Sequence, residues 1–177
     1  MSSRENTPPI VSFIGSSGSG KTTLLVKLIP EITSRGLKVG SVKHHTHDFD
    51  IDRKGKDSWR HKHAGASISM ISSPHKIGMV MDVDHDHDPD ELVPLFGNID
   101  IILCEGYKYK DVPKIEVCRS EARDEILLKD DKNLVALVSD VPFDLKVPRF
   151  LTNDMKGLAD FLIDYFNLTP SNSTVRR

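Results

Sequence analysis

The chain has 177 residues, a length that suits one domain with a sizeable hydrophobic core. Apolar residues make up 38% and charged residues 28% of the sequence, and the formal net charge of -2 provides no general field for binding nucleic acid. The low net charge therefore leads us to expect no nucleic-acid partner. No apolar run approaches the length of a membrane span and the N-terminus is polar, so we also expect no membrane partner and a cytoplasmic location.

The first part of the chain predicts a strand, a loop, a helix and a second strand. Residues 10–14 form a short apolar run, and residues 15–20 are rich in glycine and serine. A helix is predicted from Lys21 to residue 35, and residues 37–42 again resemble a strand. This order is typical of a right-handed βαβ unit in a parallel sheet.

The middle of the chain changes character twice. Residues 43–52 are polar and rich in histidine and aspartate, which predicts a loop, and residues 54–64 are compatible with a helix. Alternating apolar residues then predict two antiparallel strands, at 67–72 and 76–83. An acidic turn follows, and a short helix is predicted at 90–96.

The rest of the chain alternates predicted strands with a final helix. Residues 99–104 are almost all apolar, as expected for a strand buried on both faces. Residues 155–166 have apolar side chains at helical spacing. Further strands are predicted at 114–118, 134–139 and 149–151. The sequence thus predicts an α/β fold with a mostly parallel central sheet flanked by helices, and an additional antiparallel hairpin.

The sequence shows no internal repeat and no boundary of a second domain. We expect a flexible lead-in over residues 1–9, a single domain over residues 10–167 and a frayed tail over residues 168–177.

The loop before the first helix contains the most informative motif. Its sequence, GSSGSGKT, matches G-x-x-x-x-G-K-[ST] at every fixed position, between a predicted strand and a predicted helix. Glycines let backbone N–H groups close around phosphates, and the helix N-terminus adds partial positive charge. Lys21 would neutralise the β- and γ-phosphates, and the Thr22 hydroxyl would coordinate Mg²⁺. The sequence predicts a P-loop NTPase fold with a nucleotide site at Gly15, Ser16, Ser17, Gly18, Ser19, Gly20, Lys21, Thr22 and Thr23.

A second acidic group is needed to hold the magnesium ion, and we expect it at the end of another apolar strand. Glu105 follows the apolar run 101–104, and it is the candidate metal residue beside Thr22. Gly106 would let the backbone pass close to a γ-phosphate. Asp100 stands at the other end of the same strand, too far from the loop to share an ion. The alternative for Glu105 is an ordinary surface carboxylate.

Two aspartates leave alternatives open. Asp140 ends an apolar run and could accept hydrogen bonds from guanine, because the N/T-K-x-D box of common GTPases is absent. An ordinary aspartate at a strand end is the alternative. Asp50 lies in the polar loop after the second predicted strand, where Asp48, Asp50 or Asp52 could position a water molecule or join the Mg²⁺ shell. Asp50 and Glu105 are the only catalytic candidates, and no residue is assigned that role with certainty.

Basic and histidine-rich segments also have two interpretations. Lys56, Arg60 and His63 share one face of a predicted helix, which could bind an acidic partner or could be a solvated surface. His85 and His87 lie in an acidic turn that could bind a transition metal or could be a solvated turn.

Three segments together are similar to one known family. GSSGSGKTTLL, GLKVGSVKHHTHDFDIDRKGKDSWRHKHAGA and IILCEGYK resemble the MobB-type adapter proteins of molybdopterin-guanine dinucleotide biosynthesis, from about Pro9 to about Phe166. The resemblance implies a GTP-binding homodimer with Mg²⁺ and with weak or no GTPase activity. It implies partners as well: the guanylyltransferase that attaches GMP to molybdopterin, and other molybdenum-cofactor assembly proteins. Lys43, His44 and Asp57 fall in the second segment, to which the resemblance gives no individual roles, and Lys43 and His44 are candidate nucleotide-binding residues.

Two other functions remain as alternatives. A small-molecule kinase would need arginines over the phosphates, and Arg119 with Arg123 is the nearest pair. A metal-insertion GTPase would use the histidine-rich loops. No arginine finger or water-positioning glutamine is visible in the sequence, which predicts at most a slow GTPase.

Overall fold

The computed structural model describes residues 7–119 and 126–170. The chain divides into two compact units, one formed by Met1–His44 and Asp88–Arg177 and the other by His45–His87. The expected lead-in and tail fall largely on residues 1–6 and 171–177, which lie outside the described residues. Within the described part of the chain, every helix is too short or too polar to cross a membrane.

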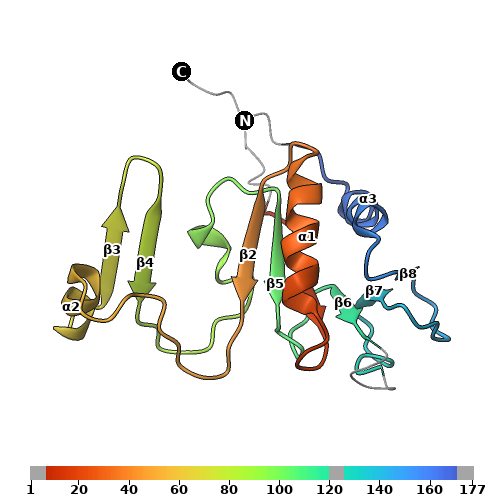
Figure 1. The fold of residues 1–177 in the computed structure, drawn as a ribbon, viewed down its shortest axis with the longest axis horizontal. Coiled ribbons are helices and arrows are strands. Elements are labelled where there is room, and N and C mark those ends of the chain that lie inside the picture. The colour runs from red at the N-terminus through yellow and green to blue at the C-terminus, as the bar shows by residue number, and fades with distance from the viewer. Residues whose placement is uncertain (1–6, 120–125, 171–177) are drawn as a thin grey trace. The chain divides into compact units, whose positions relative to one another are not determined.

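The first unit is built on a six-stranded sheet in which every neighbouring pair of strands is parallel. The strand order is β2-β5-β1-β6-β7-β8. Figure 1 labels β2 and β5 on one side of α1 and β6, β7 and β8 on the other. Because β1 stands between β5 and β6, the loop that follows β1 can meet residues from both halves of the sheet. The strands are β1 (Ile10–Ile14), β2 (Val39–Lys43), β5 (Ile101–Glu105), β6 (Lys114–Val117), β7 (Leu134–Val138) and β8 (Arg149–Phe150).

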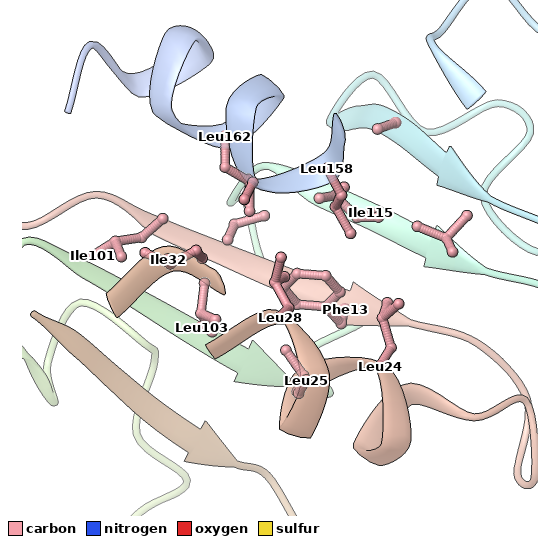
Figure 2. Packing of buried hydrophobic residues seen from close by; sticks show 14 of the residues in the cluster. Phe13, Leu24, Leu25, Leu28, Ile32, Ile101, Leu103, Ile115, Leu158 and Leu162 are labelled. Carbon is pink, nitrogen blue, oxygen red and sulfur yellow. The ribbon is translucent and has the colours of Figure 1, made fainter. Parts of the chain in front are cut away.

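Helices α1 (Lys21–Thr33) and α3 (Met155–Phe166) pack on one face of this sheet (Figure 2). Each fully buried leucine or isoleucine in such a core contributes about 1.5–3 kcal/mol. Packing therefore holds α1, and with it the glycine loop, against the central strand. The core joins Leu24, Leu25, Leu28 and Ile32 of α1, Leu158, Ala159 and Leu162 of α3, and Val11, Phe13, Ile101, Leu103, Ile115, Val117, Ala136 and Val138 of the sheet.

The opposite face of the sheet buries two charged residues of β6. Lys114 is paired with Asp131, with Nζ 2.7 Å from Oδ2. The carboxylate of Glu116 accepts hydrogen bonds from the backbone N–H groups of Leu127 at 2.7 Å and Leu128 at 2.9 Å. Burial raises the pKa of Glu116 above its ordinary value, although these two hydrogen bonds oppose the shift. Each buried charge therefore has a partner, and together they fasten the segment before β7 to the sheet.

The second unit consists of helix α2 (Asp57–His63) and the antiparallel pair β3 (Ile68–Ser72) and β4 (Ile77–Met81). The helix is joined to the hairpin by the Ser69 hydroxyl, which donates to the backbone oxygen of Ser58 at 2.9 Å. The predicted antiparallel hairpin is thus confirmed.

The α/β fold predicted from the sequence is confirmed, and the central sheet is entirely parallel. The final helix has the predicted bounds, whereas the predicted helix at 90–96 is wrong in type and length. A single turn of 3₁₀ helix, η1 (Val93–Leu95), stands there instead. Pro94 lacks a backbone N–H group, so it cannot donate the hydrogen bond that an interior position of an α-helix requires.

Candidate functional site

The loop between β1 and α1 has a backbone that only glycine fits at several positions. A Cβ atom on Gly15 would lie 2.3 Å from the carbonyl oxygen of Val117. Gly18 and Gly20 have φ angles of +78° and +89°, in the left-handed region that strains other residues. A Cβ atom on Gly18 would meet no described atom within 4 Å. The loop therefore closes tightly against β6 while leaving open space beside its backbone.

Lys21 begins α1 and folds back across this loop. Its Nζ donates hydrogen bonds to the carbonyl oxygens of Gly15 and Ser16, each at 2.9 Å. Burial lowers the pKa of the Lys21 ammonium, the negative charge of Glu105 opposes that shift, and the positive charge of Lys43 adds to it. The ammonium is thus held inside the loop, where this motif places terminal phosphates.

The serines of the loop differ in exposure. Ser17 is exposed, as is Thr23 in the first turn of α1, whereas Ser16 is half-buried and Ser19 is buried. Among the described residues, the Ser19 hydroxyl has no hydrogen-bond partner. A buried polar group without a partner costs about 1–3 kcal/mol. Such a hydroxyl fits a loop that holds a polar ligand.

Thr22 and Glu105 bring two kinds of oxygen together beside the loop. The Thr22 hydroxyl lies 2.8 Å from Oε2 and 3.0 Å from Oε1 of Glu105. The Glu105 side chain is only 13% exposed. Hydroxyl and carboxylate oxygens are ligands that Mg²⁺ prefers, so the residues present fit a magnesium ion at this position.

The residues that follow β2 and β5 pack on each other next to Glu105. Nζ of Lys43 lies 3.7 Å from Oε1 of Glu105. His44 donates its backbone N–H to the backbone carbonyl oxygen of Glu105 at 2.9 Å, and its ring stacks on Tyr107 with 4.2 Å between centroids. Gly106 has a φ of +116°, and a Cβ atom there would lie 3.0 Å from Cβ of His44. Sequence reasoning missed Tyr107, although the EGYK segment contained it; a buried ring with a positive φ is visible only in the structure.

Asp140 lies after β7, on the other side of β1. Its carboxylate accepts hydrogen bonds from the backbone N–H of Thr152 at 2.9 Å and from the Thr152 hydroxyl at 2.7 Å. These hydrogen bonds lower the pKa of Asp140, and the positive charges of Arg119 and Arg149 lower it further. Asp140 is therefore held in place as an anion at the edge of the first unit.

Arg119 follows the end of β6 and lies against the first turn of α1. A Cβ atom on Gly20 would be 2.9 Å from Cζ and 3.0 Å from Nε of Arg119. Arg123, its partner in the kinase alternative, lies outside the described residues. A small pocket at this contact is lined by Gly20, Thr23, Leu24, Lys27, Val117, Arg119 and Thr152.

The remaining candidates belong to the second unit. Asp50 is exposed in the segment before α2, and Asp57 begins that helix, with its Oδ1 3.9 Å from Nη1 of Arg60. His85 stacks on His87 with 4.0 Å between ring centroids. Throughout residues 7–119 and 126–170, no group of three or more His, Cys, Asp or Glu side chains is arranged to hold a metal ion. The first unit thus contains the P-loop residues, Lys43, His44, Glu105, Gly106 and Asp140, and the second contains Asp50.

Comparison with known sequences gives one family. The family model described as MobB, molybdopterin guanine dinucleotide synthesis protein B, matches residues 10–140. The chain is 38% identical over 166 residues to the molybdopterin-guanine dinucleotide biosynthesis adapter protein of Escherichia coli strain K12, a match that covers 89% of this chain and 93% of that protein. The adapter protein of the same description from Haemophilus influenzae is 33% identical over 164 residues, which is 92% of each chain.

Solved structures agree with this result. A crystal structure of molybdopterin-guanine biosynthesis protein B superposes with a TM-score of 0.73 at 26% identity, covering 88% of this chain and 99% of that one. A MobB homologue from Bacillus stearothermophilus superposes with a TM-score of 0.68 at 25% identity, covering 89% and 97% of the two chains. The parallel sheet with its flanking helices and hairpin is therefore the arrangement found in these structures.

Proposed function

The chain belongs to the MobB family of molybdopterin guanine dinucleotide synthesis proteins, and from this premise we propose that it is an adapter protein of that biosynthesis which binds GTP and Mg²⁺ at its glycine loop. One observation carries the nucleotide part of the proposal. The loop that Lys21 spans lies directly beside the pair formed by Thr22 and Glu105.

Each residue of the loop has a role that follows from its contacts. The ammonium of Lys21 already binds two carbonyl oxygens of the loop, and it would exchange them for phosphate oxygens, which are stronger acceptors because they are charged. The backbone N–H groups at the start of α1 carry the positive end of the helix dipole, which favours an anion there. These residues would hold the terminal phosphates of the nucleotide.

Thr22 and Glu105 would hold the magnesium ion. When bound, Mg²⁺ supplies positive charge that neutralises the phosphate oxygens. Without it, Glu105 would repel a polyphosphate, because its charge lies at the edge of the phosphate-binding loop. Lys43 lies near the same carboxylate and partly compensates its charge. The geometry therefore favours the magnesium complex of a nucleotide over the free anion.

We expect hydrolysis of bound GTP to be slow at most. The 177 residues contain no glutamine, so the amide that positions the attacking water in common GTPases is missing. The residue after Gly106 is Tyr107, which is 5% exposed and stacked on His44. The proposed role is therefore to bind and present the nucleotide rather than to turn it over.

The partners that we propose are a second copy of the chain and the guanylyltransferase that attaches GMP to molybdopterin, together with other molybdenum-cofactor assembly proteins in the cytoplasm. The exposed hairpin supports a protein interface. Met70 pairs with Met79 across the two strands, and Ile68 pairs with Met81 on the same face. Met70 is 55% exposed, Ile68 52% and Met79 39%, which is more apolar surface than a solvated hairpin needs.

Calorimetric titration with GTP and with ATP in magnesium buffer tests the proposal. We expect the wild-type chain to bind GTP, and Lys21→Ala to weaken this binding by at least about tenfold, since a charge-assisted contact is lost. Lys132→Ala is the matched control, because Lys132 is 79% exposed and forms a surface pair with Asp111. Unchanged GTP affinity in Lys21→Ala, or a preference for ATP over GTP, would contradict the proposal.

A further inference from the structure

The two flanks of the glycine loop carry different chemistry. On one flank, β2 and β5 contribute Lys43 and Glu105, and Glu105 contacts the Thr22 hydroxyl. On the other flank, the segments after β6, β7 and β8 contribute Arg119, Asp140 and Thr152. The sheet order places β1 between these two groups. A ligand that begins on the first flank and extends across the start of α1 therefore ends on the second.

This arrangement fixes the direction of a bound nucleotide. The first flank holds the residues suited to magnesium and terminal phosphates, so the nucleoside must extend toward Arg119. The small pocket on that side is lined by Gly20, Thr23, Arg119 and Thr152 and has a free volume of about 10 Å³, so a nucleoside would lie over it, against Arg119, rather than inside it. Gly20 has no side chain to block this path, and any Cβ atom there would collide with the guanidinium of Arg119.

The Asp140 carboxylate suits a base better than a phosphate. Asp140 is held as an anion by Thr152, so a phosphate placed beside it would be repelled. A guanine base instead offers N–H donors at N1 and N2, which a carboxylate accepts, whereas the corresponding edge of adenine presents an acceptor at N1. The guanidinium of Arg119 is planar and can lie flat on a base, as arginine does in nucleotide recognition.

We propose that Arg119, Asp140 and Thr152 form the guanosine-binding end of the nucleotide site, with the Arg119 guanidinium as the planar surface that contacts the base and Asp140 as the group that selects guanine. This inference rests on the proposed function, because it concerns the same bound nucleotide. Arg119, Asp140 and Thr152 would contact only the nucleoside, while the glycine loop would bind the phosphates.

Binding experiments with four probes separate these two ends of the site. The probes are GTP, GDP, ATP and inorganic tripolyphosphate, which has phosphates but no nucleoside. We expect Arg119→Ala to weaken GTP and GDP binding by about tenfold each, the scale of one stacking contact, and to leave tripolyphosphate binding unchanged. Arg119→Lys should lose about as much, because its ammonium keeps the charge but lacks the plane. Asp140→Asn should reduce the preference for GTP over ATP.

Each other outcome overturns the inference in a recognisable way. An equal loss for tripolyphosphate and GTP in Arg119→Ala, with recovery in Arg119→Lys, would make Arg119 a phosphate contact. Unchanged GTP affinity in Arg119→Ala would remove Arg119 from the site, and an unchanged GTP to ATP ratio in Asp140→Asn would remove Asp140. Wild-type chain that binds tripolyphosphate as tightly as GTP would refute the nucleoside contacts while leaving the loop intact. If the wild-type chain bound neither GTP nor tripolyphosphate, the proposed function would be refuted, and this inference with it. Arg119 and Asp140 are both exposed, so thermal unfolding should match the wild type and serves as the folding control.

Discussion

The hydroxyl of Thr22 lies 2.8 Å from a carboxylate oxygen of Glu105, although the two residues are 83 positions apart in the chain. Thr22 stands in the first turn of α1 and Glu105 is the last residue of β5. The parallel pairing of β1 with β5 brings both to the carboxyl edge of the sheet, where Phe13 is level with Glu105. The contact therefore depends on the strand order and on the position of α1 above it.

The first prediction concerns the charge of Glu105. Glu105→Gln should weaken GTP binding in magnesium buffer by about tenfold or more, because the amide is a poor ligand for Mg²⁺. GTP affinity measured in EDTA should change much less, so the ratio of the two affinities should fall. Asp100→Asn is the matched control: this carboxylate lies before the first residue of β5 and accepts from the backbone N–H of Lys38 at 2.6 Å. A wild-type affinity ratio in Glu105→Gln would argue against the magnesium site.

The second prediction concerns the close approach of the Gly15 and Val117 backbones. Gly15→Ala should abolish nucleotide binding and destabilise the protein by about 1–3 kcal/mol, because the new methyl group would lie 2.3 Å from the backbone oxygen of Val117. Urea unfolding gives the free energy of unfolding. Gly78→Ala is the control, since a Cβ atom there meets no described atom within 4 Å, and its effect should stay within about 0.5 kcal/mol. Equal stabilities for the two variants would show that the loop is not packed as described.

The third prediction concerns the buried ion pair. Asp131→Ala should destabilise the protein by about 3 kcal/mol, because the Lys114 side chain is only 3% exposed and would remain charged without this partner. Lys132→Ala removes a pair that is 79% and 76% exposed and should cost less than about 1 kcal/mol. Adding Lys114→Met to Asp131→Ala should recover part of the loss. A double variant less stable than Asp131→Ala alone would contradict the argument.

The fourth prediction concerns pH and Glu116. Burial raises the pKa of Glu116 above the ordinary 4.5. Between pH 4.5 and the pKa in the folded state, the folded protein therefore keeps a proton that the unfolded chain has released. The contribution of Glu116 to the free energy of unfolding therefore falls as the pH rises from about 4.5 through the folded pKa. The advantage of wild type over Glu116→Gln should be largest in acid and should shrink as the pH rises.

Asp160 provides a control of opposite sign for that experiment. Hydrogen bonds from Lys156 and Arg35 lower the pKa of Asp160, so its stabilising effect is present above the ordinary 3.8 and is lost as the pH falls through the folded pKa. The advantage of wild type over Asp160→Asn should thus grow with pH. Urea unfolding between about pH 2.5 and about pH 7 measures both profiles, the Asp160 profile at the acid end and the Glu116 profile above about pH 4.5. A constant difference between wild type and Glu116→Gln would show that Glu116 does not titrate differently in the two states.

Local sequence predicted the elements that build the proposed nucleotide site. Periodicity and backbone preference suffice to find the apolar run at β1, the glycines of the loop and the helix that begins at Lys21. Each of these features depends only on neighbouring residues. The position of Glu105 at a strand end followed from the same reasoning. The helix predicted at 90–96 failed because Pro94 and local turns outweighed a weak helical pattern.

By itself, the sequence determined the strands, the long helices α1 and α3 and the glycine loop, since each depends on residues a few positions apart. Only the tertiary structure decided which strands flank β1, and hence that Arg119 lies on Gly20, that His44 stacks on Tyr107 and that Thr152 binds Asp140. These pairs are set by the packing of helices and strands around a common core. That packing depends on the shape and burial of many distant side chains together, which no short stretch of sequence records.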